Sequence, residues 1–163
     1  MLHFFLPILI AWALAVDPVD DQATAAPVTV ADTQARAPEP QIATGTFTTA
    51  LEVKPILGMT KPNWIAVRLY EGQDLLYFSN LLGWRCGLWD IRYGINGAPA
   101  DQLLRLEPCH SDMAAPNVMI EVADYLPYVT FAPESVQSVT VEITYDDGTV
   151  DSADYDRNAV LIP

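Results

Sequence analysis

Basic residues are scarce in this sequence. Eight Lys and Arg stand against 21 Asp and Glu among 163 residues, so the formal net charge is −13 at pH 7. A surface with this excess of negative charge repels phosphate backbones and anionic lipid headgroups. We therefore expect no nucleic-acid partner, and no membrane attachment once an N-terminal leader is removed.

The residues and motifs of enzyme active sites are equally rare. The chain has two histidines, His3 and His110, and contains neither a Gly-x-Ser-x-Gly motif nor a Gly-rich phosphate loop. Nucleophilic catalysis therefore has few residues to use. A carboxylate pair such as Glu107 and Asp112 could support acid–base chemistry, so an uncharacterised hydrolase stays open as a second alternative. We expect a non-catalytic protein without a cofactor.

Apolar runs are too short to span a membrane. The longest covers the thirteen residues 4–16, whereas a membrane-spanning helix needs about 20. Thirteen residues match the core of a secretory signal peptide, and Ala13-Leu14-Ala15 forms a small-x-small cleavage site. Since no cysteine follows this core, a lipoprotein anchor is not supported. The sequence predicts a signal peptide at residues 1–15 and a periplasmic or secreted protein.

The segment after the predicted signal peptide lacks aromatic residues. Residues 16–45 are rich in Ala, Pro, Thr and Asp and show no sustained periodicity. Such a composition cannot bury enough apolar surface to offset the entropy lost on ordering. We interpret residues 16–45 as a flexible acidic spacer and residues 46–163 as one folded domain.

Only two cysteines are present, Cys86 and Cys109, and both lie in this domain. In an oxidising compartment an even pair most often forms a disulfide. Closing a loop of this length stabilises the folded state by roughly 3 kcal/mol in the chain-entropy model. We predict a Cys86–Cys109 disulfide.

Turn signals and period-two alternation predominate in the domain, whereas no apolar helical stripe persists beyond about two turns. Residues 75–82 could form either a strand or a short helix. The predicted strands cover residues 46–54, 64–70, 75–80, 88–95, 102–107, 118–122, 128–131, 138–145, 149–155 and 159–162. About eight of these ten segments, as short strands without intervening helices, predict an all-β, antiparallel immunoglobulin-like β-sandwich.

Two hairpins carry the clearest signals. Asn96-Gly97 and Asp146-Asp147-Gly148 are turn sequences, because these residues tolerate positive φ. The alternation before each turn predicts which side chains face the core: Trp89, Ile91, Tyr93 and Ile95 in the first, and Val139, Val141, Ile143 and Tyr145 in the second.

The domain contains the segments WRCGL, IRYGING, a second Cys followed by His, LPYVTF and SVTVEITYDDGT. Together they resemble a family of small exported proteins from alphaproteobacteria. The resemblance covers most of residues 46–163 and is most specific between residues 77 and 110. The family has no assigned activity. The resemblance therefore implies export and supplies no mechanism.

One short cluster has side chains suited to metals. Cys109, His110 and Met113 resemble the soft ligands of copper, and Asp112 lies among them. The spacing matches no metal motif well, and Cys109 is assigned to the disulfide. A metal-handling protein using His110, Met113 and nearby carboxylates is the first alternative function. The acidic end of the chain departs from the EF-hand pattern, although calcium on a looser set of carboxylates stays open.

The stretch from residue 84 to residue 93 is rich in Trp, Tyr and Arg, the residues most enriched in interface hot spots. Alternation assigns Trp89 to the core and leaves Arg92 outward, whereas Trp84 fits either environment. We predict that Trp84, Arg85 and Arg92 contact a partner beside the disulfide. The leading hypothesis is an exported non-catalytic domain that binds a protein.

Overall fold

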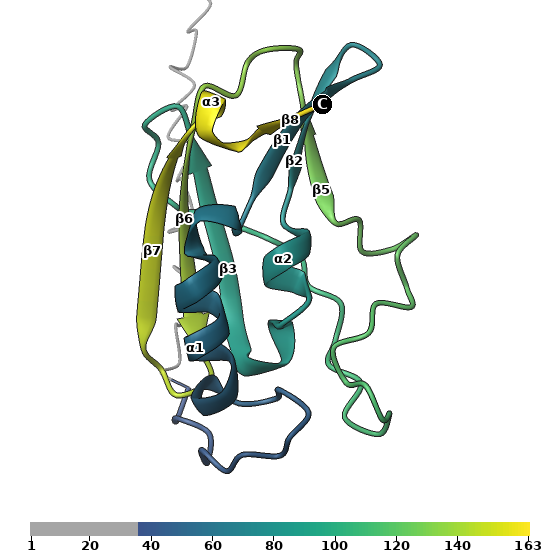
Figure 1. Cartoon of the computed structure of the whole chain (residues 1–163), viewed down its shortest axis with the longest axis vertical. Helices are drawn as coiled ribbons and strands as arrows, with labels where there is room; N and C mark the ends of the chain where they lie inside the picture. Colours follow the sequence, from purple (N-terminus) through teal and green to yellow (C-terminus); the bar gives the residue numbers. More distant parts are fainter. Residues whose placement is uncertain (1–35) are drawn as a thin grey trace, which may run out of the picture. The chain divides into compact units, whose positions relative to one another are not determined.

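The structure, a computed structural model, describes residues 36–163 (Figure 1). The predicted signal peptide and the spacer up to residue 35 lie outside the described residues. Among the helices of residues 36–163, none is long and apolar enough to cross a membrane.

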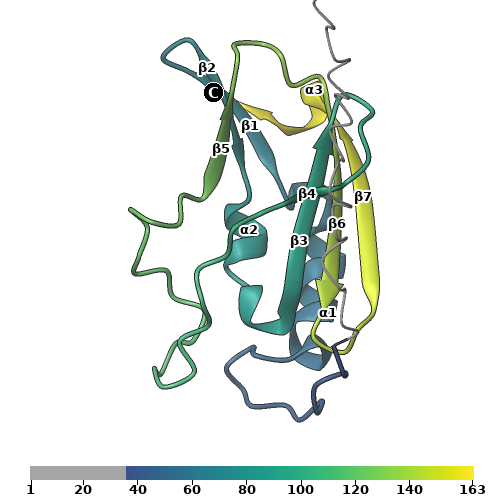
Figure 2. The same cartoon turned by 180° about the vertical axis from the view of Figure 1, so that it is seen from behind.

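The described chain is mostly β, with two four-stranded sheets in a sandwich-like arrangement (Figures 1 and 2). Sheet A has the order β5-β2-β1-β8, and sheet B has the order β4-β3-β6-β7. All neighbours pair antiparallel except β1 and β8, which are parallel. The strands are β1 (Ala66–Tyr70), β2 (Gln73–Tyr77), β3 (Leu88–Ile95), β4 (Gln102–Leu103), β5 (Tyr128–Phe131), β6 (Ser138–Tyr145), β7 (Val150–Asp156) and β8 (Leu161–Ile162).

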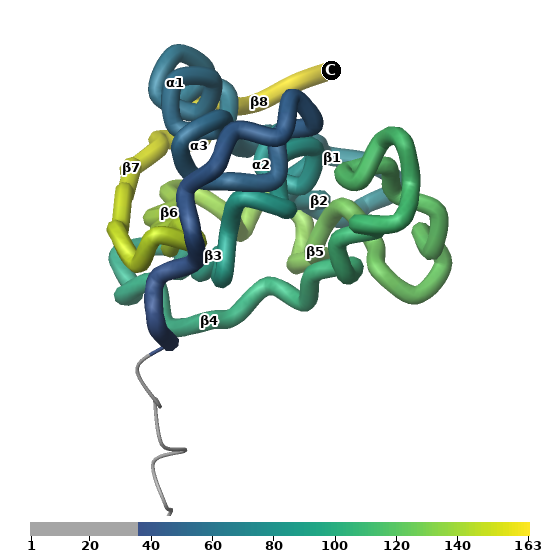
Figure 3. The backbone as a smooth tube through the Cα atoms, turned by 90° about the horizontal axis from the view of Figure 1, so that it is seen from below, coloured from purple at the N-terminus to yellow at the C-terminus, as the bar shows by residue number. Residues whose placement is uncertain are grey.

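Helices lie between the strands along the chain, so the predicted absence of intervening helices is wrong. Helix α1 lies against one face of sheet B, as the views from the side and from below show (Figures 1 and 3). Lys54 in the middle of α1 forms an ion pair with Asp147, just before β7, and Lys61, directly after the helix, forms one with Asp151 on β7. The helical elements are α1 (Ala50–Thr60), η1 (Lys61–Asn63), α2 (Ser79–Leu82), η2 (Arg85–Gly87) and α3 (Arg157–Val160).

The strand predicted at residues 46–54 is wrong, because α1 occupies most of it. Ala50, Val53 and Leu57 are fully buried, and their spacing places them on one helical face. The Glu52 carboxylate accepts hydrogen bonds from the backbone N–H groups of Gly45 and Thr48 and from the Thr49 hydroxyl. Thr49-x-x-Glu52 has the residue types and spacing of a capping box, although Thr49 makes no side-chain cap of its own. Thr49-x-x-Glu52 was therefore a signal for a helix start in the sequence. The alternation of residues 46–54, however, also fits a strand.

A second cap on α1 comes from far along the chain. The Asp146 carboxylate accepts a hydrogen bond from the N–H of Ala50 at 2.7 Å. It also accepts one from Gln41 Nε2 at 2.9 Å, and the Asp146 carbonyl accepts one from the N–H of Glu39 at 2.8 Å. Residues 36–45, predicted as part of a flexible spacer, thus bind to the domain.

The predicted β3 and β6 strands are confirmed, and β6 buries Val139, Val141, Ile143 and Tyr145 as expected. Asn96 and Gly97 adopt φ of 55° and 82° at the predicted turn. The predicted return strand 102–107 is reduced to Gln102–Leu103, and residues 118–122 form no strand. Residues 75–82, which fitted either a strand or a helix, form the end of β2 followed by α2.

Trp89 departs from the predicted inward position. The register of β3 on β6 shifts between Leu88 and Asp90, and such a bulge re-aims the extra side chain. The Trp89 ring is only partly buried, and its Nε1 donates to the Glu39 carboxylate at 3.1 Å. Arg36 lies over the same ring at 5.9 Å.

One buried ion pair joins sheet A to the C-terminal segment. Asp74 on β2 is fully buried, and Arg157 donates to its two carboxylate oxygens at 2.6 and 2.8 Å. The N–H of Val136 donates to the same carboxylate at 3.0 Å. The hydrogen bond from Arg157 is the main cause that lowers the pKa of Asp74 below its usual value.

Replacing Asp74 with Asn should lower the free energy of unfolding by about 3–5 kcal/mol at neutral pH, because Arg157 keeps a buried charge without its partner. Since the folded-state pKa of Asp74 is lowered, its stabilisation is complete above the unfolded pKa of about 4 and is lost as the pH falls. Urea denaturation at neutral and acid pH tests both effects. Equal losses in Asp74→Asn and in the exposed control Asp101→Asn would contradict this role.

Candidate functional site

A pocket of about 780 Å³ lies beside the disulfide. Three parts of the chain line it: residues 36–49, residues 85–89 in η2 and the start of β3, and residues 106–116. The last of these belong to the segment 104–127 between β4 and β5, here called the long loop, which forms turns but neither helix nor strand. The pocket wall therefore depends on what holds an irregular segment in place.

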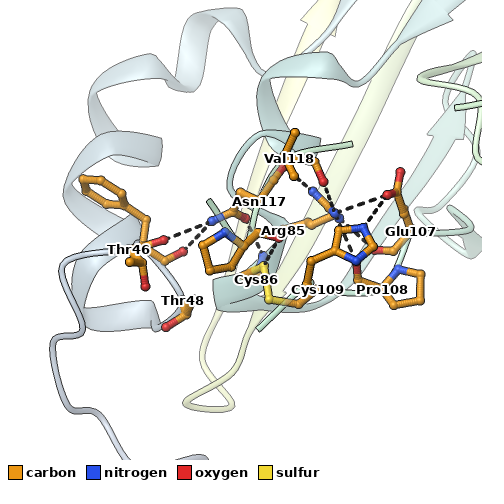
Figure 4. Close-up of a disulfide and its surroundings, with 12 residues drawn as sticks. Thr46, Thr48, Arg85, Cys86, Glu107, Pro108, Cys109, Asn117 and Val118 are labelled. Carbon is orange, nitrogen blue, oxygen red and sulfur yellow. Dashed lines mark hydrogen bonds and ion pairs between the residues drawn. A yellow bond between two sulfur atoms is a disulfide. The ribbon is translucent and has the colours of Figure 1, made fainter. Parts of the chain in front are cut away.

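The disulfide is the first attachment of the long loop. Cys86 and Cys109 lie with their sulfurs 2.16 Å and their Cα atoms 5.2 Å apart, so the predicted pairing is confirmed (Figure 4). Cys86 sits in η2, directly before β3. The bond thus ties the long loop to the entry of the central strand of sheet B.

Arg85 is the second attachment, and it was predicted to contact a partner. Its side chain is 1% exposed, and its guanidinium group points into the protein (Figure 4). It donates hydrogen bonds to five carbonyl oxygens, of Leu82, Glu107, Pro108, Asn117 and Val118, at 2.5–3.3 Å. All five donors of an Arg can be used in this way. Arg85 therefore organises the loop and is not available at the surface.

Glu107 is the buried counter-charge. Its side chain is fully buried, 3.9 Å from Arg85 Nη2. Its Oε1 accepts hydrogen bonds from the N–H of Ile120 at 2.9 Å and pairs with His110 Nε2 at 2.6 Å. Burial raises the pKa of Glu107, but the contacts with His110, Ile120 and Arg85 outweigh it and hold this pKa below its usual value. Its contribution to stability is therefore lost as the pH falls.

Asn117 is a third attachment, which sequence reasoning missed. Its Oδ1 accepts a hydrogen bond from the N–H of Cys86 at 2.9 Å, and its Nδ2 donates to the Phe47 carbonyl at 2.8 Å. The side chain thus bridges η2, the long loop and the segment before α1. An Asn followed by Val carries no local signal for such a long-range bridge.

The other predicted partner residues are separated from one another. Trp84 packs partly buried against the core, with its ring edge-on to Phe47 at 5.2 Å between centroids. Arg92 is half-buried on β3, opposite Leu103 of β4, and reaches the Asp101 carbonyl at 3.4 Å. The three residues Trp84, Arg85 and Arg92 therefore do not form one exposed patch.

The residues predicted for a metal site or for a hydrolase site also do not come together in one cluster. Within residues 36–163, no three His, Cys, Asp or Glu side chains come together in a way that could hold a metal ion. His110 is engaged by Glu107, whereas Asp112 and Met113 are exposed. Ser111 lines the pocket, but in the described chain its hydroxyl makes no hydrogen bond to His110. Ser111 is therefore not positioned as a nucleophile for the His110–Glu107 pair.

The outer side of the long loop is apolar. Five large apolar side chains on it are 37–56% exposed, namely Met113, Val118, Ile120, Val122 and Leu126. Here these five are called the loop patch. Monomeric proteins rarely expose large contiguous apolar patches, and such patches mark interaction sites.

Comparison of the chain with models of protein families, with curated proteins and with solved structures gives no match. The resemblance to exported alphaproteobacterial proteins therefore stays a prediction.

Replacing Arg85 with Ala should lower the free energy of unfolding by about 3–5 kcal/mol, because Glu107 and five carbonyls lose their buried partner. Arg85→Lys should recover little, since an ammonium group has only three donors. The control Arg92→Ala should change stability by no more than about 0.5 kcal/mol. Urea denaturation followed by Trp fluorescence measures all three, and an Arg85→Ala variant as stable as Arg92→Ala would refute the role of Arg85.

Proposed function

We propose that the protein is an exported, non-catalytic binding domain that captures a protein partner through its loop patch. We also propose that its sandwich-like architecture is immunoglobulin-like in strand connectivity. The observation that carries the functional proposal is the combination of exposed apolar side chains with a buried framework that fixes the segment bearing them.

The framework matters because binding costs entropy. An irregular segment of this length would ordinarily sample many conformations and would lose them on binding. The Cys86–Cys109 disulfide, the five hydrogen bonds of Arg85 and the bridge made by Asn117 fix the long loop before a partner arrives. A larger share of the contact energy is then available for affinity.

The charges around the loop patch indicate the kind of surface that fits it. Asp112, Glu121 and Asp124 are exposed on the same loop, and the whole chain carries a net charge of −13. Interfaces place apolar side chains at the centre and polar groups at the rim, with complementary charge. The partner surface we propose is apolar at its centre and carries Lys or Arg at its rim.

An extracytoplasmic location supports the same proposal. A disulfide is characteristic of oxidising compartments such as the periplasm or the extracellular medium. The Cys86–Cys109 bond closes a separation of 23 residues and anchors the loop patch. The proposal therefore requires the oxidised protein, and reduction should weaken partner binding together with loop order.

The test replaces two members of the loop patch without touching its framework. Ile120→Ser with Val122→Ser removes side chains that are 56% and 42% exposed. We expect this variant to retain its melting temperature and to bind the partner at least about tenfold more weakly, since two apolar contacts are lost. The measurement is quantitative cross-linking capture from periplasmic extract, followed by a binding titration with the purified partner.

The matched control is Leu103→Ser with Val150→Ser. Both side chains are 57% exposed, and both lie on edge strands of sheet B, outside the long loop. This control should bind like the unmodified protein. If the loop variant captures the same proteins with the same affinity, or if the control loses binding equally, the loop patch is not the binding surface.

A further inference from the structure

The solvent side of sheet A carries a second distinctive surface. Residues paired across neighbouring strands point to the same side of a sheet. The register aligns Arg68 with Leu75 and Thr130, Tyr77 with Tyr128, and Tyr70 with Gln73. The alternate residues Val67 and Leu76 are fully buried in the core. The set on the outer side, here called the tyrosine face, consists of Arg68, Tyr70, Gln73, Leu75, Tyr77, Tyr128 and Thr130. Its neighbours cover Leu75, which is only 7% exposed.

Two adjoining hollows are present on this face. One, of about 450 Å³, lies toward Asn63, Ser79 and Asn80, and the other, of about 380 Å³, lies toward Glu71 and Thr130. Arg68 and Tyr77 line both hollows, so the two adjoin at these side chains. Small-molecule sites are concave surfaces in this range of volume, whereas the loop patch is an exposed apolar segment.

Aromatic rings form the apolar part of the hollows. The rings of Tyr77 and Tyr128 lie 5.2 Å apart and are inclined at 57° to one another. Tyr70 is 47% exposed, and Arg68 lies over its ring at 5.1 Å. Tyrosine rings offer large, rigid contact surfaces with a polar end at the water side. Their π faces are negative and attract the weakly positive C–H groups of a sugar ring.

The polar groups beside these rings are not used inside the protein. In residues 36–163, the side chains of Asn63, Arg68 and Gln73 make no hydrogen bond to another residue, whereas Arg85 and Arg157 donate to acceptors inside the protein. Amide and guanidinium groups present paired donors and acceptors at fixed geometry. Such pairs match neighbouring hydroxyl groups on a sugar ring.

Glu71 adds an acceptor at the rim of the second hollow. It lies in the two-residue turn between β1 and β2 with φ of 50°, a left-handed conformation that Gly or Asn would adopt at lower cost. Its carboxylate also balances the charge of Arg68, so the hollows carry one group of each sign. In a chain with net charge −13, this balance favours a neutral ligand over an anionic one.

From the paired tyrosines, the unused amide and guanidinium groups and the balanced charge, we infer that the tyrosine face binds a neutral oligosaccharide. One sugar ring stacks on the outer side of the contacting Tyr77 and Tyr128 rings, and Gln73, Arg68 and Asn63 bind its hydroxyl groups and those of the neighbouring sugars. This site is independent of the loop patch, because the two surfaces share no residue.

The experiment titrates the purified, oxidised protein with four neutral probes, namely chitohexaose, cellohexaose, maltohexaose and mannohexaose. Hexagalacturonate serves as the anionic comparison. Amide NMR spectra should show millimolar or tighter binding of at least one neutral hexasaccharide, with shifts centred on Arg68, Gln73 and Thr130. Tyr77→Ala and Gln73→Ala should each weaken that binding, the first by about tenfold, which corresponds to about 1.4 kcal/mol.

Controls separate this site from folding and from the loop patch. Tyr125→Ala removes a tyrosine on the long loop, and Ile120→Ser with Val122→Ser alters the loop patch, so both should bind the sugar normally. Gln73→Ala removes an exposed side chain and tests the site even if Tyr77→Ala unfolds.

Three results would overturn the inference. The first is no shift on the tyrosine face with any of the four neutral probes, and the second is stronger binding of hexagalacturonate. The third is a concentration-dependent dimer in sedimentation that Tyr70→Ala dissociates, because the face would then be an interface between two copies. None of these results bears on partner capture by the loop patch, so the two proposals can fail separately.

Discussion

The rest of the site depends on one buried guanidinium group. The long loop has no helix or strand to satisfy its backbone, and buried carbonyl groups need hydrogen-bond partners. Arg85 provides them, binding four carbonyls of the long loop and that of Leu82 at the end of α2. An Arg serves here because its five donors spread over a plane and its charge is permanent. The charge must itself be compensated, and Glu107 does this from within the loop.

These contacts explain why an irregular segment can present a defined surface. Glu107 binds the N–H of Ile120 on its buried side, while the side chain of Ile120 points to solvent as part of the loop patch. The disulfide adds a covalent attachment to Cys109, only two positions beyond Glu107. The buried contacts of Glu107 and Cys109 and the exposed side chains of the loop patch therefore belong to the same short segment. Loss of the charge of Arg85 or Glu107 would loosen both. The tyrosine face, in contrast, is carried by regular strands and does not need this framework.

The sequence predicted the parts of the fold that local patterns control. Alternation in β6 gave the correct buried side chains, and Asn96-Gly97 gave the correct turn, because both depend on neighbours in the chain. The α1 helix was missed because residues 46–54 also alternate as a strand would, which competed with the local signal Thr49-x-x-Glu52. The cap from Asp146, 96 residues away from Ala50, carries no local signal. Trp89 was misplaced because a bulge interrupts the alternation. In the site, the Cys86–Cys109 pairing was predictable, whereas the five carbonyls around Arg85 were not, since an Arg beside two tryptophans reads equally well as a surface residue.

Amide hydrogen exchange of the long loop tests the central claim most directly, because it reports whether this irregular segment is ordered in solution. The informative amides are those of Cys86, His110 and Ile120, which donate to Asn117 Oδ1, the Pro116 carbonyl and the Glu107 carboxylate. We predict that all three exchange as slowly as amides of β3 and that Arg85→Lys accelerates them while leaving β6 protected. Exchange of these three amides at the rate of an unstructured chain in the unmodified, oxidised protein would contradict the account.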